Sequence, residues 1–471
     1  MQDFLQGHFD DTNESIQRFE AMNQHLREQY FDVHEVENMF DYYLETNQMD
    51  LAEQILSIGL KQHPDAIPLQ IKLSIVLSEQ GFFDEALEII EYHLKFDPQS
   101  PELLMSMGWL CLKKGDDVNA LKYFDETLRF AGNDEESFLL DIGFNLNQEG
   151  CFELAVDYLR KGCDRYPHNE NMWFELAYAY ERTEDDEAGI EAYSTLLDMN
   201  PFFDNAWYNL GILYNRTGQF AKAIEAYEFS IAIVSDHSES FFNMGNSYAH
   251  LDQFEMALDC YLTYASYGFE NTMTFQYIGE CLEQLGQVDK AIRYYEMVIE
   301  HNPQFADAWY GIGTSLMNSS RIAESIYPLE QAVRLQPKNP DYCFALGKAY
   351  RELMAYDKAI ACIEKGLMQD PEEIWAWIEL VQLHTEKDPL FNFIEFIDRA
   401  LVEYPTVGAV SYMAAVIYFK FAQDKDLALG YLKVGRRRQP DDLQVVLTEF
   451  PELLNAPEIT KLINKKAKNV K

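Results

Sequence analysis

The sequence predicts an all-α protein, built as an array of about twelve two-helix units. The spacing of proline is the first observation behind this prediction. Nine prolines recur at multiples of 34 residues, give or take one residue, and they are Pro64, Pro98, Pro167, Pro201, Pro303, Pro337, Pro371, Pro405 and Pro440. A fixed period of this length is typical of repeat proteins, in which each unit is one supersecondary element that stacks on its neighbours.

The pattern inside one period is the second observation, and it is clearest between Trp207 and Tyr227. One face of a first helix is predicted, because its members follow the spacing i, i+3, i+4 and i+7: Trp207, Leu210, Gly211 and Tyr214. Gly218 then breaks the chain, and Ala223 and Tyr227 lie on the apolar face of a second helix. The absent side chain of Gly211 allows a neighbouring helix to approach closely.

This order of an aromatic residue, Leu-Gly, Tyr, and then Ala and a second aromatic residue resembles the tetratricopeptide repeat, or TPR. The resemblance implies a right-handed α-solenoid superhelix of about twelve TPR helix-turn-helix units with helical caps. It also implies that the first helices line a concave groove in which peptides bind. Pairs such as Ile278-Gly279 and Leu346-Gly347 repeat the Leu-Gly feature in other periods.

Taken in order, residues 1–32 are expected to form an N-terminal region with a capping helix. The TPR array is expected to span residues 33–442, with units that start near residues 33, 67, 101, 136, 170, 204, 238, 272, 306, 340, 374 and 409. Residues 443–471 are expected to form C-terminal capping helices and a basic tail. The unit from Ile374 departs from the pattern, since Val381 replaces its glycine and Asp388-Pro389 forms its turn.

Composition limits the class of partner. The chain has 37 basic and 79 acidic residues, which gives a formal net charge of −42. A surface this acidic repels the phosphates of nucleic acid, and it favours a basic or neutral protein or peptide partner. Seven cysteines without a Cys-x-x-Cys pair indicate reduced thiols. With no signal peptide and no apolar run long enough for a membrane span, the sequence predicts a cytoplasmic protein.

No catalytic constellation is found in the sequence. It contains no HExxH, no GxGxxG, no Walker-type loop and no GxSxG. Its ten histidines show no metal-ligand spacing. The sequence therefore predicts no enzyme activity, no cofactor and no metal site.

The expected groove carries a row of aromatic residues, each one residue past the tryptophan place of its unit. The row and the asparagines beside it are predicted to bind the partner, and they are Phe174, Tyr208, Asn209, Phe242, Asn243, Asn246, Tyr310 and Phe344. An asparagine amide can both donate to and accept from a peptide unit, while aromatic rings cover side chains. In a second interpretation, the rings pack on adjacent first helices and the asparagines bridge turns.

These residues predict a non-enzymatic interaction scaffold or adaptor that holds a peptide segment or partner protein in the concave groove. The carboxylate clamp of chaperone adaptors is not expected, because it needs a lysine where this row is aromatic and no unit has one. The alternative function is a structural subunit of a larger or self-associating assembly, which would use convex or edge surfaces. The sequence does not decide the oligomeric state.

Overall fold

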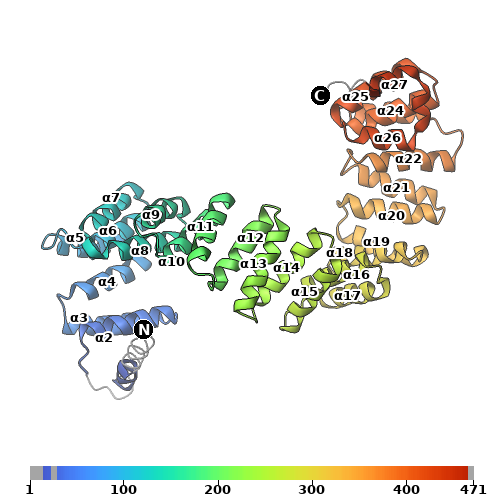
Figure 1. The fold of residues 1–471 in the computed structure, drawn as a ribbon. Coiled ribbons are helices and arrows are strands. Elements are labelled where there is room, and N and C mark those ends of the chain that lie inside the picture. Colours follow the sequence, from blue (N-terminus) through green and yellow to red (C-terminus); the bar gives the residue numbers. More distant parts are fainter. Residues whose placement is uncertain (1–13, 23–28, 465–471) are drawn as a thin grey trace. The chain divides into compact units, whose positions relative to one another are not determined.

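The computed structural model describes residues 14–22 and 29–464, and within these ranges it contains helices and no strand. The prediction of an all-α fold is confirmed (Figure 1). The chain divides into two compact bodies, residues 1–217 and residues 218–471. We call them the N-terminal body and the C-terminal body.

After the helical residues 14–22, the helices of the N-terminal body are α2 (Val33–Glu45), α3 (Met49–Gln62), α4 (Ile67–Glu79), α5 (Phe83–Leu94), α6 (Pro101–Lys114), α7 (Asp117–Phe130), η1 (Gly132–Asp134), α8 (Glu135–Gln148), α9 (Phe152–Arg165), α10 (Glu170–Arg182), α11 (Asp186–Met199) and α12 (Asp204–Arg216).

The helices of the C-terminal body are α13 (Phe220–Ile233), α14 (Ser238–His250), α15 (Phe254–Ser266), α16 (Thr272–Gln284), α17 (Val288–His301), α18 (Ala306–Asn318), α19 (Ile322–Leu335), α20 (Pro340–Glu352), α21 (Tyr356–Leu367), α22 (Ile374–Lys387), α23 (Phe393–Glu403), α24 (Gly408–Lys420), α25 (Lys425–Arg438), α26 (Asp442–Glu449), η2 (Pro451–Asn455) and α27 (Pro457–Asn464).

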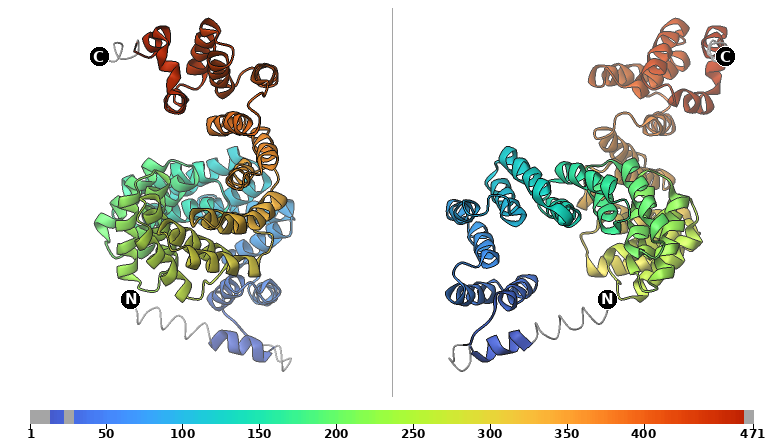
Figure 2. Two further views of the ribbon diagram at one scale, coloured as in Figure 1. Left: turned by 90° about the vertical axis from the view of Figure 1, so that its right-hand side faces the viewer. Right: turned by 60° about the vertical axis from the view of Figure 1, so that its left-hand side comes forward.

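Helices α2 to α25 alternate as first and second helices, in agreement with about twelve predicted units. Within each body the two helices of a unit pack on each other, as α6 does on α7 and α18 on α19. The second helix then packs on the first helix of the next unit, as α9 does on α10 and α17 on α18. Figures 1 and 2 show these hairpins stacked in chain order within each body. First helices of successive units also touch, as α16 and α18 do.

The turn between α6 and α7 shows how the sequence ends one helix and begins the next. Gly115 ends α6 in the left-handed region at φ 84°, a conformation that glycine adopts without steric cost. The Asp116 side chain then accepts a hydrogen bond from the backbone N–H of Asn119 and caps α7. Two residues therefore suffice to reverse the chain between these helices.

A glycine on the first helix leaves room for a side chain of the second helix to pack against the helix backbone. A Cβ atom added to Gly279 would lie 2.6 Å from Cε1 of Tyr295, and one added to Gly245 would lie 2.8 Å from Cε1 of Tyr261. Tyr295 also lies against Gly311 of the next first helix, where an added Cβ would lie 2.6 Å from its Cζ. The buried Tyr295 ring is thus enclosed between two glycines, which is the close approach that the Leu-Gly feature predicts.

The unit of α22 and α23 is built differently. Val381 is buried at the place of the glycine, and Ile397, which corresponds to Tyr295, is buried on α23. A branched side chain fills the space that the glycine leaves open in other units. The backbones of α22 and α23 accordingly lack the close packing found in the hairpin of α20 and α21. The connecting turn, residues 388–392, is also longer than the turn of residues 353–355 between α20 and α21.

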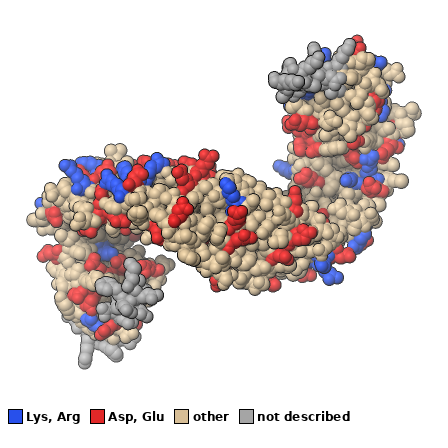
Figure 3. Space-filling model, in the orientation of Figure 1, with Lys and Arg blue, Asp and Glu red and all other residues tan. Residues whose placement is uncertain are grey.

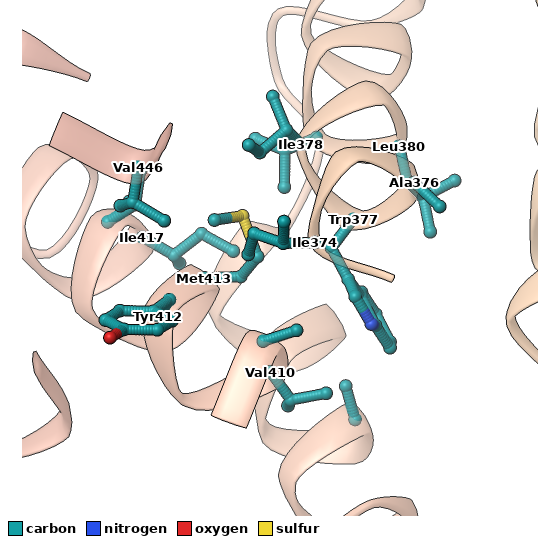
Figure 4. Close-up of a cluster of buried hydrophobic side chains, with 14 of the residues drawn as sticks. Ile374, Ala376, Trp377, Ile378, Leu380, Val410, Tyr412, Met413, Ile417 and Val446 are labelled. Atoms are coloured by element: carbon teal, nitrogen blue, oxygen red, sulfur yellow. The ribbon is translucent and has the colours of Figure 1, made fainter. Parts of the chain in front are cut away.

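Helix α24 lies in the centre of the largest apolar cluster. Its residues 408–417 are all buried, because α22, α23, α25 and α26 pack around it. In Figure 4, Ile374 and Ile378 lie on the side of α22 toward Met413, while Leu380 lies on the opposite side. Helix α22 therefore contributes one side to this cluster and turns another side toward α21, with which it also packs.

The helical residues 14–22 cover the start of the array. Phe19 is buried, and its ring centroid lies 5.8 Å from that of Tyr43 on α2. Arg18 forms an ion pair with Glu35 at 2.6 Å. Residues 1–13 and 23–28 of the expected N-terminal region, and the part of the basic tail after residue 464, lie outside the described residues.

Candidate functional site

The residues predicted to bind a partner lie on first helices in both bodies. Phe174 is on α10, and Tyr208 and Asn209 are on α12, in the N-terminal body. In the C-terminal body, α14 carries Phe242, Asn243 and Asn246, α18 carries Tyr310, and α20 carries Phe344. Each of these side chains is half-buried. Because α18 contacts both α16 and α20, the first helices of the C-terminal body form a continuous layer there.

In the N-terminal body, Phe174 packs with its ring stacked on Phe203, with centroids 5.2 Å apart. It also meets the ring of Tyr193 edge-on, at 5.9 Å. The amide nitrogen of Asn209 donates a hydrogen bond to the Tyr193 hydroxyl at 3.0 Å. Burial, more than any other cause, raises the pKa of Tyr193, so this hydroxyl stays protonated at neutral pH.

In the C-terminal body, Phe242 lies among tyrosines in the same way. Its centroid is 5.0 Å from that of Tyr264 and 5.5 Å from that of Tyr277. The amide oxygen of Asn246 accepts a hydrogen bond of 2.7 Å from the hydroxyl of Tyr261, a buried residue of α15. A tyrosine of a second helix thus meets an asparagine of a first helix in both bodies.

Tyr310 and Phe344 also combine packing with partial exposure. The ring of Tyr310 stacks on that of Tyr342, with centroids 5.0 Å apart. Phe344 packs against Gly366 of α21, which leaves no room there for a Cβ atom. The structure thus places these rings against second helices, neighbouring turns and, for Phe242 and Tyr310, the adjacent first helices, as the second interpretation expected. Part of each ring is still exposed. The asparagines Asn209 and Asn246 bond tyrosine hydroxyls rather than bridging turns.

Sequence reasoning missed a group of oxygen acceptors on α16. The buried Gln276 donates through its amide nitrogen to the Glu280 carboxylate at 2.8 Å, and its amide oxygen has no hydrogen-bond partner among the described residues. The Glu283 carboxylate accepts from the hydroxyl of Tyr295 at 3.0 Å. Burial raises the pKa of both glutamates above the ordinary value.

A signal for this group was present in the sequence. Gln276 is the one residue of the row from Phe174 to Phe344 that is not aromatic. Because the group offers more acceptors than donors, it suits a ligand that supplies N–H groups, such as a lysine or arginine side chain. On the face drawn in Figure 3, Asp and Glu side chains are spread over both bodies.

The described residues hold neither a metal cluster nor a membrane-spanning helix. Among the described residues, no cluster of three or more His, Cys, Asp or Glu side chains is arranged to hold a metal ion. All seven cysteines are free thiols. In the part of the chain that the structure describes, no helix has the length and apolar character needed to cross a membrane.

Comparison with known proteins gave matches to family models and to solved structures. One family model, described as tetratricopeptide repeat, matches residues 71–135, 148–202, 174–234 and 279–340, and a second with the same description matches residues 340–373. Together they cover more than half of the chain. The comparison with curated proteins gave no match.

Parts of the chain resemble many solved structures, and three of them serve as examples. YrrB, described as a TPR protein with an unusual peptide-binding site, is 21% identical, covers 42% of this chain and 100% of its own, and has a TM-score of 0.35. The C-terminal part of a TPR repeat-containing protein from Cytophaga hutchinsonii is 20% identical, with 51% and 98% covered and a TM-score of 0.38. PilW, a type IV pilus biogenesis factor, is 18% identical, with 43% and 94% covered and a TM-score of 0.38.

Proposed function

Since the chain belongs to the tetratricopeptide repeat family, we propose that it is a non-enzymatic scaffold that binds a peptide segment of a partner protein along its first helices. The observation that carries the proposal is the set of half-buried aromatic rings and asparagines on first helices of each body, on α10 and α12 in the N-terminal body and on α14, α18 and α20 in the C-terminal body. Rings held by packing on one side lose little freedom when a peptide covers the other side.

Asparagines add hydrogen bonds to this surface. Asn246 uses its oxygen to hold the Tyr261 hydroxyl, and Asn209 uses one amide hydrogen to hold Tyr193. A carboxamide has two N–H donors and an accepting oxygen, so each bond fixes the side chain and uses only part of its capacity. Each bond to a peptide would contribute roughly 0.5–1.5 kcal/mol, so affinity requires several units together.

The acceptors on α16 suggest which peptides fit. On α16, a first helix of the C-terminal body, Glu280 accepts from the amide of Gln276, whose buried amide oxygen has no partner among the described residues, and Glu283 lies one turn further along. A lysine or arginine of the peptide would supply the missing donors and the opposite charge. A basic segment is therefore the preferred partner, in keeping with the formal charge of −42. The proposed site of action is the cytoplasm.

The proposal is tested by affinity capture from a lysate of the source cells, with bound proteins identified by mass spectrometry. Phe242→Ala combined with Asn243→Ala alters the first helix α14. Met256→Ala combined with Leu262→Ala is the matched control, because both residues are exposed on α15, the second helix of the same unit. Loss of a partner with the α14 variant alone supports the proposal, whereas equal capture by both variants contradicts it.

The alternative is a subunit of a self-associating assembly that leaves the first-helix surface empty. Exposed apolar side chains in inter-helix turns, such as Phe96 and Phe202, would serve such contacts. Light scattering of the pure protein separates the two functions. A mass well above 54.8 kDa favours the assembly, and a monomer favours the scaffold.

A further inference from the structure

The hairpin of α22 and α23 opens a pocket that lies on a different surface from the proposed groove. Its walls come from the second helices α21 and α23 and from the side of α22 that carries Trp377 and Leu380. Val381 stands at the glycine place of this unit, the backbones of α22 and α23 make little close contact, and the long turn of residues 388–392 contributes Phe391 and Asn392 to the pocket lining. The pocket has a volume of about 500 Å³, within the range usual for ligand sites.

The inner wall of the pocket is aromatic. The indole ring of Trp377 meets the ring of Tyr404 edge-on at 5.9 Å and lies 6.3 Å from that of Phe396. Phe391, from the long turn, stacks on His384 with centroids 3.9 Å apart. Because the indole N–H of Trp377 donates to the carbonyl of Pro371 at 2.9 Å, its ring is fixed in place. These rings are preorganised to receive a large apolar side chain.

One polar atom in this wall lacks a partner. The Nε2 atom of His384 is buried, and no hydrogen-bond partner for it exists among the described residues. Burial lowers the pKa of His384, so the ring is neutral at neutral pH and Nε2 can accept or donate one hydrogen bond. A buried polar atom left unpaired costs free energy, which a bound group with a matching donor or acceptor would recover.

The rim of the pocket is acidic. Glu364 on α21 and Glu403 on α23 are exposed, and neither forms an ion pair among the described residues. The one arginine of the rim, Arg399, is paired with Glu395 on its own helix. An occupant with a positive charge beside its apolar part would therefore match this rim.

A second hollow continues the same surface along α23. It shares Asn392, Glu395, Arg399 and Glu403 with the pocket, and it adds Ile394, Asp398 and Val402. The Val402 side chain is 83% exposed and nearby Leu390 is 92% exposed. Two adjoining hollows with apolar side chains at their edges suit an extended chain better than a compact small molecule.

We propose that the pocket between α21, α22 and α23 is a second docking site, which binds a peptide segment of a partner protein with a large apolar or aromatic side chain next to Lys or Arg. The apolar side chain enters between Trp377 and Phe391, and the basic side chain meets Glu364 and Glu403. This site is independent of the first-helix surface, since its walls contain no residue of the aromatic row.

The hollow at the corresponding place between α17, α18 and α19 provides an internal comparison. Trp309 occupies the place of Trp377 there. Its rim holds Arg293 and Arg321 among the carboxylates, and Arg321 pairs with both Asp289 and Glu324. That hollow is lined by four carboxylates and two arginines, and the pocket over Trp377 by three carboxylates and one arginine, so each has a formal excess of two negative charges. The two differ in their ion pairs, because Arg321 joins Asp289 of α17 to Glu324 of α19, whereas Arg399 pairs with Glu395 of its own helix.

The proposal is tested with random peptides displayed on phage, selected on the immobilised full chain, followed by titration of a synthetic copy of the enriched peptide. The test variant is Glu364→Lys with Glu403→Lys. Its matched control is Glu296→Lys with Glu300→Lys, which makes the same change in net charge in the corresponding hollow. Ala400→Leu narrows the pocket without changing its rim, and circular dichroism checks that each variant folds.

The expected result is enrichment of peptides with Phe, Trp, Leu or Met beside Lys or Arg. Their dissociation constant should rise about tenfold or more in Glu364→Lys with Glu403→Lys and stay unchanged in the control. No enrichment on the wild-type chain would overturn the proposal. Enriched peptides that lack basic residues would also overturn it, as would peptides that bind the test variant as tightly as they bind the wild-type chain. If enrichment appears only after the chain is cut behind Thr460, the occupant is its own basic tail and the partner site is disproved.

Discussion

The glycines that enclose Tyr295 give a sharp prediction about stability. In Gly279→Ala the new Cβ would lie 2.6 Å from Cε1 and 2.8 Å from Cδ1 of Tyr295. The ring cannot retreat, because its other side lies against Gly311, where an added Cβ would lie 2.6 Å from Cζ. Overpacking of this kind costs about 1–3 kcal/mol. Alanine in place of a helical glycine stabilises by about 1 kcal/mol, so the net expected loss is about 0–2 kcal/mol.

Gly430→Ala is the matched control, because Gly430 lies inside α25 and an added Cβ would meet no atom within 4 Å. It should stabilise the protein by about 0.5–1 kcal/mol through helix propensity alone. Repeat arrays do not unfold in one step. The free energy is therefore measured locally, by hydrogen exchange of amides in α16 to α18 and in α25, alongside urea unfolding.

The two substitutions should change the local free energy of unfolding in opposite directions. Gly279→Ala should speed exchange in α16, α17 and α18, and Gly430→Ala should slow exchange in α25. If Gly279→Ala stabilised its helices as much as Gly430→Ala does, Tyr295 would not be enclosed as described. The conclusion that the second helix packs its ring against the glycine of the first helix would then be wrong.

Three further predictions concern buried groups of the C-terminal body. Burial raises the pKa of Cys260 and Cys281 to about 12, so neither thiol should react with a disulfide reagent at mildly alkaline pH until denaturant is added; rapid reaction of the native protein would contradict this. Burial also raises the pKa of Glu283, so the native state binds this proton more tightly than the unfolded state does. The resulting stabilisation is present below the ordinary glutamate pKa and is lost as pH rises through the raised value. Thermal unfolding followed by circular dichroism should therefore shift upward on mild acidification, and less so in Glu283→Gln; an equal shift in both proteins would refute the assignment. Tyr261→Phe removes the hydroxyl that donates to Asn246 and should cost about 1 kcal/mol in urea unfolding, whereas an unchanged midpoint would show that this bond contributes nothing.

The fold was predictable because one pattern recurs along the chain. Gly279 and Tyr295 follow the same spacing as Gly245 and Tyr261, and each pair packs in the same way. The packing of a unit depends on residues that are close in sequence, so the period alone predicts the hairpins. The aromatic row was likewise visible in the sequence, and its role in binding a partner stays a prediction.

The chemistry of the surface was less predictable. That Asn209 would bond the hydroxyl of Tyr193 depends on how one unit stacks on the next, and spacing alone does not give that geometry. The replacement of glycine by Val381 was visible in the sequence, but the pocket it opens needs the positions of Phe391 and Trp377 from two different elements. Departures from the repeat were therefore easier to detect than to interpret.

Hydrogen exchange of the full chain with and without its captured partner tests the central claim most directly. If the first-helix surface binds the partner, amides and turns of α14, α16, α18 and α20 should gain protection when the partner is present, and those of α15, α17 and α19 should change little. Protection restricted to the second helices would contradict the claim and place the partner on the opposite surface. Protection of α21 to α23 alone would support the second docking site and leave the first-helix surface without a ligand.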